Sequence, residues 1–258
     1  MTGPCGPVLQ VCLNGLRSPG DSAAVPMSPD SLAASAASAV AAGAHEVRVH
    51  PRTPCGRTSL SPRVLGPVLT SLRAAVGAAG AGTTAGRPVR VATAMSAEPD
   101  AERRPERIRS WVSLPDLVSV DWHEPHAEHL AAALLSRGVA VEAALRPGTD
   151  GPARFARSPL APRVARVLAS AQGPATGSGP AAARSVALAV GLLAEIGRPG
   201  GVPLLLHGVE SGAWPVLRLA RRLGLAARIG LEDTLRLPDG TWARSNAELV
   251  AAAVAVAY

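Results

Sequence analysis

The stretch Glu46-Val-Arg-Val-His50-Pro51-Arg52 is a short β-type run that ends in polar side chains. Arg228-Ile-Gly-Leu-Glu232-Asp233 repeats this arrangement near the other end of the chain. A parallel α/β fold places its chemistry at the carboxyl ends of its strands, which is where both polar groups fall. The two stretches therefore predict strands that open on a metal-centred or anion-binding pocket. The alternative is that two of many strand ends simply carry charge.

Short β-rich runs alternate with alanine-rich helical runs along the whole chain. Glycine, proline or polar residues bound each β-rich run, as is typical of strands. The predicted strands are Val8–Leu13, Glu46–His50, Val89–Ala94, Leu117–Val120, Val139–Glu142, Val164–Ala169, Val202–Leu206 and Ala226–Gly230. Eight β/α units in 258 residues favour a (β/α)8 TIM barrel over an open doubly wound sheet. We predict a single domain over residues 1–258.

The segments between these strands have helical apolar periodicity. Ser28 before Pro29 predicts a capped helix start, and Gly43 and Gly138 stand where helices should end. The predicted helices are Pro29–Ala42, Pro62–Ala79, Ala101–Trp111, Ala127–Arg137, Ala181–Ile196, Ser211–Leu223 and Asn246–Ala257. The segment Thr149–Pro162 is the weakest helix candidate, and we expect a loop with one turn there.

Composition narrows the class of protein. An apolar content of 47% suffices for a full core, built from Val, Leu and Ala because aromatic residues make up only 2%. The net charge of +7 comes entirely from arginine. The absence of lysine excludes a Schiff-base mechanism. The arginines are scattered and few aromatic rings are available for base stacking, so we expect no nucleic-acid partner.

The chain shows no sign of a secreted or membrane protein. Its three cysteines are odd in number and lack Cys-x-x-Cys spacing, which indicates neither a disulfide framework nor a thiolate zinc site. No basic region precedes an apolar stretch at the N-terminus, and Arg184 and Glu195 interrupt the most apolar run, Ala181–Ile196. We therefore predict a cytoplasmic protein with no membrane partner.

Polar side chains follow strand after strand at the predicted carboxyl rim. For any one of them a structural role is common, because polar loop groups often only satisfy the backbone. Their convergence on one rim favours function. The candidates for substrate contact are Asn14, Arg17, Arg52, Asp121 and Glu124, and Thr93 and Glu142 end two further strands.

His50 and Glu232 carry the donor atoms that zinc prefers. His207, which follows another strand, would complete three protein ligands; alternatively, it is a hydrogen-bonded or substrate-contacting histidine. Arg228 and Asp233 flank Glu232 and are predicted to act as a carboxylate clamp and a base, because a guanidinium binds carboxylates through a bidentate fork.

Six strings in this order point to a known family. They are Val11-Cys-Leu-Asn-Gly-Leu-Arg17, Met27-Ser-Pro-Asp-Ser-Leu-Ala33, Ala42-Gly-Ala-His-Glu-Val-Arg-Val-His-Pro-Arg52, Ser119-Val-Asp-Trp-His-Glu-Pro125, Arg228-Ile-Gly-Leu-Glu-Asp-Thr-Leu235 and Ser245-Asn-Ala-Glu-Leu-Val250. With them the chain resembles, over nearly its whole length, the β-keto acid cleavage enzymes, also called 3-keto-5-aminohexanoate cleavage proteins. The Gly-Leu-Glu-Asp and Ser-Asn-Ala-Glu-Leu-Val strings are the most specific.

The resemblance implies a (β/α)8 barrel in a homotetramer with a divalent metal, typically zinc. It implies that a β-keto acid condenses with acetyl-CoA to give acetoacetate and a new CoA thioester. The metal would be held by a His-x-His motif after the second strand and by the glutamate of Gly-Leu-Glu-Asp. The second histidine is His50 and the glutamate is Glu232, but Arg48 stands at the first histidine. Arginine stays protonated and has no lone pair to give, so unless His207 substitutes we expect weakly held metal.

The resemblance also implies catalytic residues. Its arginine and aspartate match Arg228 and Asp233, which would orient the substrate carboxylate and help generate the enolate that attacks the thioester. Its hydroxyl on the third strand corresponds to Thr93 or to Ala92, and its acid on the fifth strand to Glu142.

Three functional hypotheses remain open. The first, which the motifs favour, is an acetyl-CoA-dependent β-keto acid cleavage enzyme whose metal polarises the substrate carbonyl and whose surface arginines meet the CoA phosphates. The second is a barrel that has lost metal and catalysis and serves as a binding or assembly subunit, because Arg48 replaces a ligand. The third is a metal-dependent lyase or hydrolase with another substrate, since a barrel alone does not define chemistry.

Overall fold

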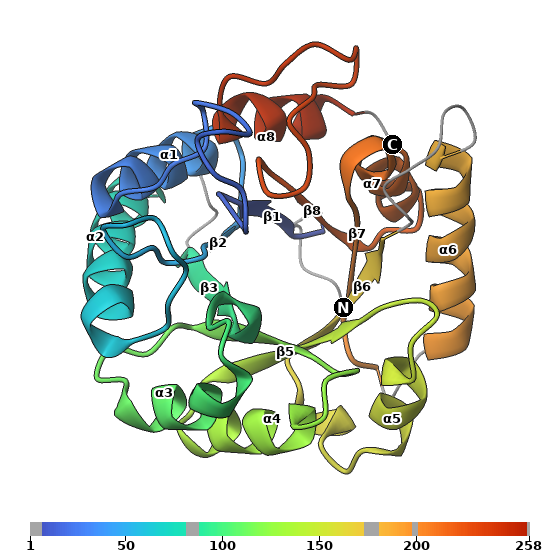
Figure 1. Cartoon of the computed structure of the whole chain (residues 1–258). Coiled ribbons are helices and arrows are strands. Elements are labelled where there is room, and N and C mark those ends of the chain that lie inside the picture. Colours follow the sequence, from blue (N-terminus) through green and yellow to red (C-terminus); the bar gives the residue numbers. More distant parts are fainter. Residues whose placement is uncertain (1–6, 81–87, 173–180, 198–200, 257–258) are drawn as a thin grey trace.

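The structure is a computed structural model that describes residues 7–80, 88–172, 181–197 and 201–256 (Figure 1). Eight parallel strands close into a barrel in chain order, β1 to β8. They are β1 (Leu9–Cys12), β2 (Glu46–Arg48), β3 (Arg90–Ala94), β4 (Leu117–Asp121), β5 (Ala140–Leu145), β6 (Arg166–Ala171), β7 (Leu204–Gly208) and β8 (Ala226–Ile229). Each coincides with a predicted strand, so the (β/α)8 barrel is confirmed.

Helices surround the barrel as an outer ring (Figure 1). The α-helices are α1 (Pro29–Ala41), α2 (Pro62–Gly80), α3 (Arg104–Ser110), α4 (Ala127–Ser136), α5 (Gly151–Arg157), α6 (Ala181–Ile196), α7 (Ala213–Arg222) and α8 (Asn246–Ala255). Short 3-10 turns are η1 (Met95–Ala97), η2 (Ala101–Arg103), η3 (Ala161–Arg163) and η4 (Glu210–Gly212). Within the described residues, no helix is long and apolar enough to cross a membrane.

Two helix predictions need correction. The predicted helix over 101–111 is divided, because Asp100 caps the η2 turn and Pro105 stands in the first turn of a separate α3. The weak segment 149–162 holds α5 as well as the η3 turn. Phe155 of α5 stabilises this segment, since its buried ring packs edge-on against Trp122 with the two ring centroids 5.1 Å apart.

Strand side chains alternate between two different cores. Every second residue packs outward against the helices, as Val11, Val47 and Val91 do on three neighbouring strands. The residues between them face the barrel interior, and many of these are charged. The strand register sets Gln10 level with Glu46, and Glu46 level with Arg90. Charged and polar side chains therefore fill much of the interior of the barrel.

Candidate functional site

The candidate site is a cavity of about 320 Å³ at the carboxyl end of the barrel. Its walls come from the segments that follow β1, β6, β7 and β8. The lining residues are Leu16, Arg17, Asp21, Gln172, Val209, Glu210, Arg228 and Glu232. Two of the predicted site residues of the stretch 228–233, Arg228 and Glu232, thus line one cavity with the predicted contact Arg17.

Arg228 is held by two carboxylates from its own segment. Its Nη2 lies 2.6 Å from Asp233 Oδ1 and 2.9 Å from Glu232 Oε1, and its Nε also donates to Asp233. Burial raises the pKa of Asp233, but the Arg228 guanidinium lowers it more, to well below its usual range. Asp233 is consequently a permanent anion that fixes Arg228, with His207 Nδ1 3.4 Å from the same carboxylate.

His50 is buried just beyond the end of β2, with its backbone held on both sides. Asn14 Nδ2 donates to the His50 carbonyl at 2.9 Å, and the His50 amide donates to Asn14 Oδ1 at 3.0 Å. Thr93 fixes the preceding residue, because its hydroxyl donates to the Val49 carbonyl at 2.8 Å. Neither ring nitrogen of His50 has a hydrogen-bond partner. Burial lowers the pKa of His50 to about 4, so the imidazole is neutral at pH 7.

Glu232 is seated against a glycine that no other residue can replace without strain. Gly15 has φ +54°, and a Cβ there would lie 2.3 Å from Glu232 Cγ. Burial raises the pKa of Glu232, but the nearby Arg228 and Arg48 guanidinium groups lower it by more, so that the pKa is about 2. Glu232 Oε1 accepts from Arg228, whereas Oε2 has no hydrogen-bond partner.

Arg48 extends from β2 across the interior of the barrel. Its Nη1 donates to Ser119 Oγ at 2.7 Å and to Glu142 Oε1 at 3.4 Å, and its Nε lies 3.9 Å from Glu232 Oε2. Ser119 also donates to Glu142. Ser119 was not among the predicted site residues, although it stands two positions before Asp121 and therefore on the same face of β4.

Glu142 links this group to a second buried arginine that the sequence pattern did not single out. It accepts from Arg166, whose Nη1 lies 2.6 Å from Glu46 Oε2. Arg90 Nε donates to Glu46 Oε1 at 2.8 Å. Burial raises the pKa of Glu142, but Arg166 and Arg48 lower it more, to about 2. The predicted acid on the fifth strand is thus an ionised member of a continuous charge network.

Two predicted contacts shape the loop after β1. Arg52 donates to the carbonyls of Gly56 at 3.0 Å and Arg17 at 2.8 Å, and so joins the loops that follow β1 and β2. Arg17 lines the site cavity and forms an ion pair with Glu210 at its rim. In this structure Arg52 supports the wall and Arg17 forms part of it.

Asp121 and Glu124, predicted as substrate contacts, each bind an arginine: Arg146 from the loop after β5 and Arg104 from the start of α3. Asp121 Oδ1 accepts from Arg146 Nη2 at 2.9 Å, and Glu124 pairs with Arg104. Neither carboxylate is among the residues that line the site cavity. The structure therefore brings the charged residues of β2, β5 and β8 together and leaves Asp121 and Glu124 outside the cavity wall.

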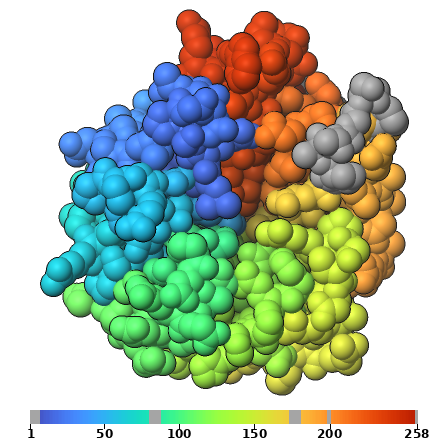
Figure 2. Space-filling model, viewed as in Figure 1, coloured from blue at the N-terminus to red at the C-terminus, as the bar shows by residue number. Residues whose placement is uncertain are grey.

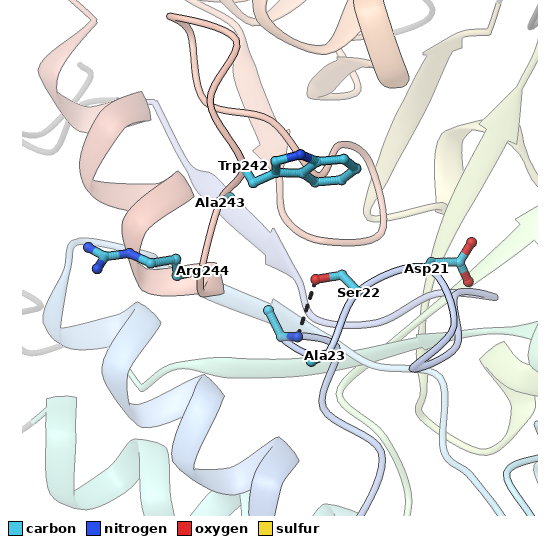
Figure 3. Close-up of a pocket in the computed structure, with 7 residues that line it drawn as sticks. Asp21, Ser22, Ala23, Trp242, Ala243 and Arg244 are labelled. Atoms are coloured by element: carbon cyan, nitrogen blue, oxygen red, sulfur yellow. Dashed lines mark hydrogen bonds between the residues drawn. The ribbon is translucent and has the colours of Figure 1, made fainter.

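A second hollow of about 560 Å³ lies beside the site, lined by the β1–α1 and β8–α8 segments. The N-terminal and C-terminal parts of the chain, blue and red, adjoin on the face shown in Figure 2. The hollow is lined by Asp21, Ser22, Trp242 and Arg244, among others, and Asp21 lines both cavities (Figure 3). The Arg236 guanidinium carbon lies 4.2 Å from the centre of the Trp242 ring. This hollow is larger, but the smaller one is lined by two ion pairs, Arg17–Glu210 and Arg228–Glu232, so we place the chemistry in the smaller one.

Solved structures resemble this one at the level of the fold. The ternary complex of ObcA with a C4-CoA adduct and oxalate matches with 16% identity and a TM-score of 0.65. That match covers 88% of this chain and 62% of the other, so the chain spans less than two thirds of that protein's length. The apo form of the homocysteine methyltransferase MmuM from Escherichia coli matches with 16% identity and a TM-score of 0.58, covering 98% of this chain and 97% of that one.

No curated protein sequence matches the chain. The family model of the beta-keto acid cleavage enzymes, by contrast, matches residues 7–258 and so includes all eight strands and every site residue described above. The match extends over much more than half of the sequence and agrees with the resemblance that the motifs carry. The chain belongs to the β-keto acid cleavage enzyme family.

Proposed function

We propose that the chain is a CoA-dependent acyltransferase that cleaves a β-keto acid. A substrate R–CO–CH2–COO⁻ and acetyl-CoA would give acetoacetate and R–CO–S–CoA, so that the acyl group R–CO moves to the thiol of CoA. The observation that carries this proposal is the cavity at the carboxyl end of the barrel, where the paired Arg228 and Glu232 form one wall. Family membership supports the same substrate class.

In this proposal Arg228 orients the substrate carboxylate. Its guanidinium is fixed by Asp233 and Glu232, so little conformational entropy remains to be lost when an anion binds.

His207 is better suited than Asp233 to accept the proton from the carbon between the two carbonyl groups. Burial first, and then Arg228, lower the pKa of His207, which keeps the imidazole neutral while Asp233 orients it.

Acetyl-CoA needs a binding surface for its nucleotide end, and the second hollow is suited to it. Trp242 is 57% exposed and offers a ring on which an adenine can stack. Arg236 lies beside the Trp242 ring and Arg244 lines the same hollow, so that both guanidinium groups can bind the phosphate groups of CoA. Because Asp21 lines both cavities, an acetyl-CoA molecule whose adenine stacks on Trp242 can extend directly into the site.

The zinc ion that the sequence resemblance implies does not fit the residues present. Zinc requires lone-pair donors, typically three from the protein, and at the first histidine position stands Arg48, which has none. The Arg48 cation also approaches within 3.9 Å of the Glu232 carboxylate oxygen. Among the described residues, no group of three or more His, Cys, Asp or Glu side chains is arranged to hold a metal ion.

The test is acetyl-CoA-dependent consumption of a panel of β-keto acids, followed as acetoacetate formation. We expect Glu232→Gln to abolish turnover without unfolding the protein, because it removes one of the two anions that hold Arg228. The matched control is Glu195→Gln on the exposed side of α6. Retained turnover in Glu232→Gln would remove this residue from the mechanism. Absence of turnover in the wild type with every acid of the panel would instead favour the binding or assembly subunit, for which Arg48 is the supporting observation.

A further inference from the structure

Four buried polar atoms at the ends of β2 and β8 have no hydrogen-bond partner. They are Arg48 Nε, both ring nitrogens of His50 and Glu232 Oε2. Buried polar atoms in folded proteins are nearly always satisfied, so a cluster of unsatisfied ones indicates a place that a polar ligand completes. Arg48 supplies a donor, Glu232 an acceptor and His50 at least one further N–H.

The charges around these atoms already balance without a metal ion. Ion pairs connect four arginines and four carboxylates in one network through the barrel interior. The arginines are Arg48, Arg90, Arg166 and Arg228, and the carboxylates are Glu46, Glu142, Glu232 and Asp233. A divalent cation beside Glu232 would add two positive charges to this neutral group, next to the Arg48 guanidinium. With histidine at position 48 the same network would carry one net negative charge.

We propose that the guanidinium of Arg48 takes the position and the positive charge of the family's metal ion, so that this site binds its β-keto acid without a metal. The identity of the ligand rests on the function proposed above. A β-keto acid exchanges with its enol, whose hydroxyl oxygen both accepts and donates a hydrogen bond. That oxygen satisfies Arg48 Nε–H and Glu232 Oε2 together, and the His50 ring supplies a further hydrogen bond.

Arg48→His tests the replacement directly, because it restores the His-x-His spacing before His50. We expect the dialysed wild type to hold less than about a tenth of an equivalent of zinc and Arg48→His to hold about one equivalent. The variant should fold, since Glu142 keeps Arg166 and Ser119 as partners. Circular dichroism verifies this. The matched control is Arg90→His, the same substitution at the partly exposed end of the same network, which should gain no zinc.

Calorimetric titration with acetoacetate, a β-keto acid, supplies a second readout. The wild type should bind it equally well with and without EDTA, whereas in Arg48→His we expect EDTA to weaken binding at least about tenfold. A full equivalent of zinc in the dialysed wild type, or failure of Arg48→His to gain any, overturns the inference. So does loss of wild-type acetoacetate binding in EDTA. These readouts use metal content and binding, while turnover alone decides the proposed function, so the two can fail separately.

Discussion

Replacement of Glu142 by glutamine should measure the contribution of the buried charge network to stability. Glu142 is fully buried and accepts hydrogen bonds from Arg48, Arg166 and Ser119. Glutamine keeps the size of the side chain but removes its charge. Breaking a buried ion pair from one side costs about 3–5 kcal/mol. We expect about 3 kcal/mol here, because Arg166 retains Glu46 at 2.6 Å and Arg48 retains Glu232 at 3.9 Å.

The pH dependence of unfolding gives a second value for the same contribution. The folded-state pKa of Glu142 is lowered to about 2 from an ordinary value of 4.5. Such a difference corresponds to about 3 kcal/mol of stability. Because the folded pKa is the lower one, this stability is fully present above pH 4.5 and is lost as the pH falls through about 2. About 2 kcal/mol of it should have disappeared by pH 3.

Urea unfolding at pH 7 and at pH 3 measures both quantities. At pH 7 Glu142→Gln should be less stable than the wild type by about 3 kcal/mol. Between the two pH values the wild type should lose about 2 kcal/mol more than the variant, because the other carboxylates titrate in both proteins. Glu195→Gln, an exposed change, should follow the wild type at both pH values. A variant within about 1 kcal/mol of the wild type at pH 7, or with the same acid loss, would refute the reasoning.

Two further substitutions test how the site and the barrel are supported. Gly15→Ala should displace Glu232 and cost about 1–3 kcal/mol, because the new Cβ would lie 2.3 Å from Glu232 Cγ at a backbone φ of +54°; thermal unfolding and acetoacetate binding should both worsen, and normal binding would contradict the seating of Glu232. Phe155→Ala should cost about 3–5 kcal/mol by leaving Trp122 without its ring partner; chemical unfolding measures this cost, and a loss below about 1 kcal/mol would show that α5 does not depend on this contact.

The sequence predicted the barrel because short β-rich runs alternate with helical runs along the whole chain, and the two kinds of run have different apolar periodicity. Each predicted strand coincides with an observed one, and the polar groups of the second and eighth strands lie at the carboxyl end as expected. The errors fall where local signals were weak. Phe155 stabilises the segment 149–162 through its contact with Trp122, a residue of another loop. No local sequence pattern predicts that contact.

The partners of the site residues were harder to predict than the residues themselves. Arg48 was recognised as a departure from the family pattern, but its contacts with Ser119 and Glu142 join residues 71 and 94 positions apart. Only the strand register decides which side chains stand level in a closed barrel. Arg166 illustrates the same limit, since an arginine within a buried strand shows its role only once Glu46 and Glu142 are placed beside it.

The substitution at position 48 is best understood through the charge balance of the whole interior. An arginine that merely replaced a metal ligand would leave a buried cation without compensation, at a cost of several kcal/mol. Here the cation faces Glu142 on one side and Glu232 on the other, while Arg166 and Arg228 share these carboxylates. The barrel therefore accommodates Arg48 as part of a neutral network. The charge that a metal would bring to Glu232 is already present in the side chain, fixed in place by Ser119.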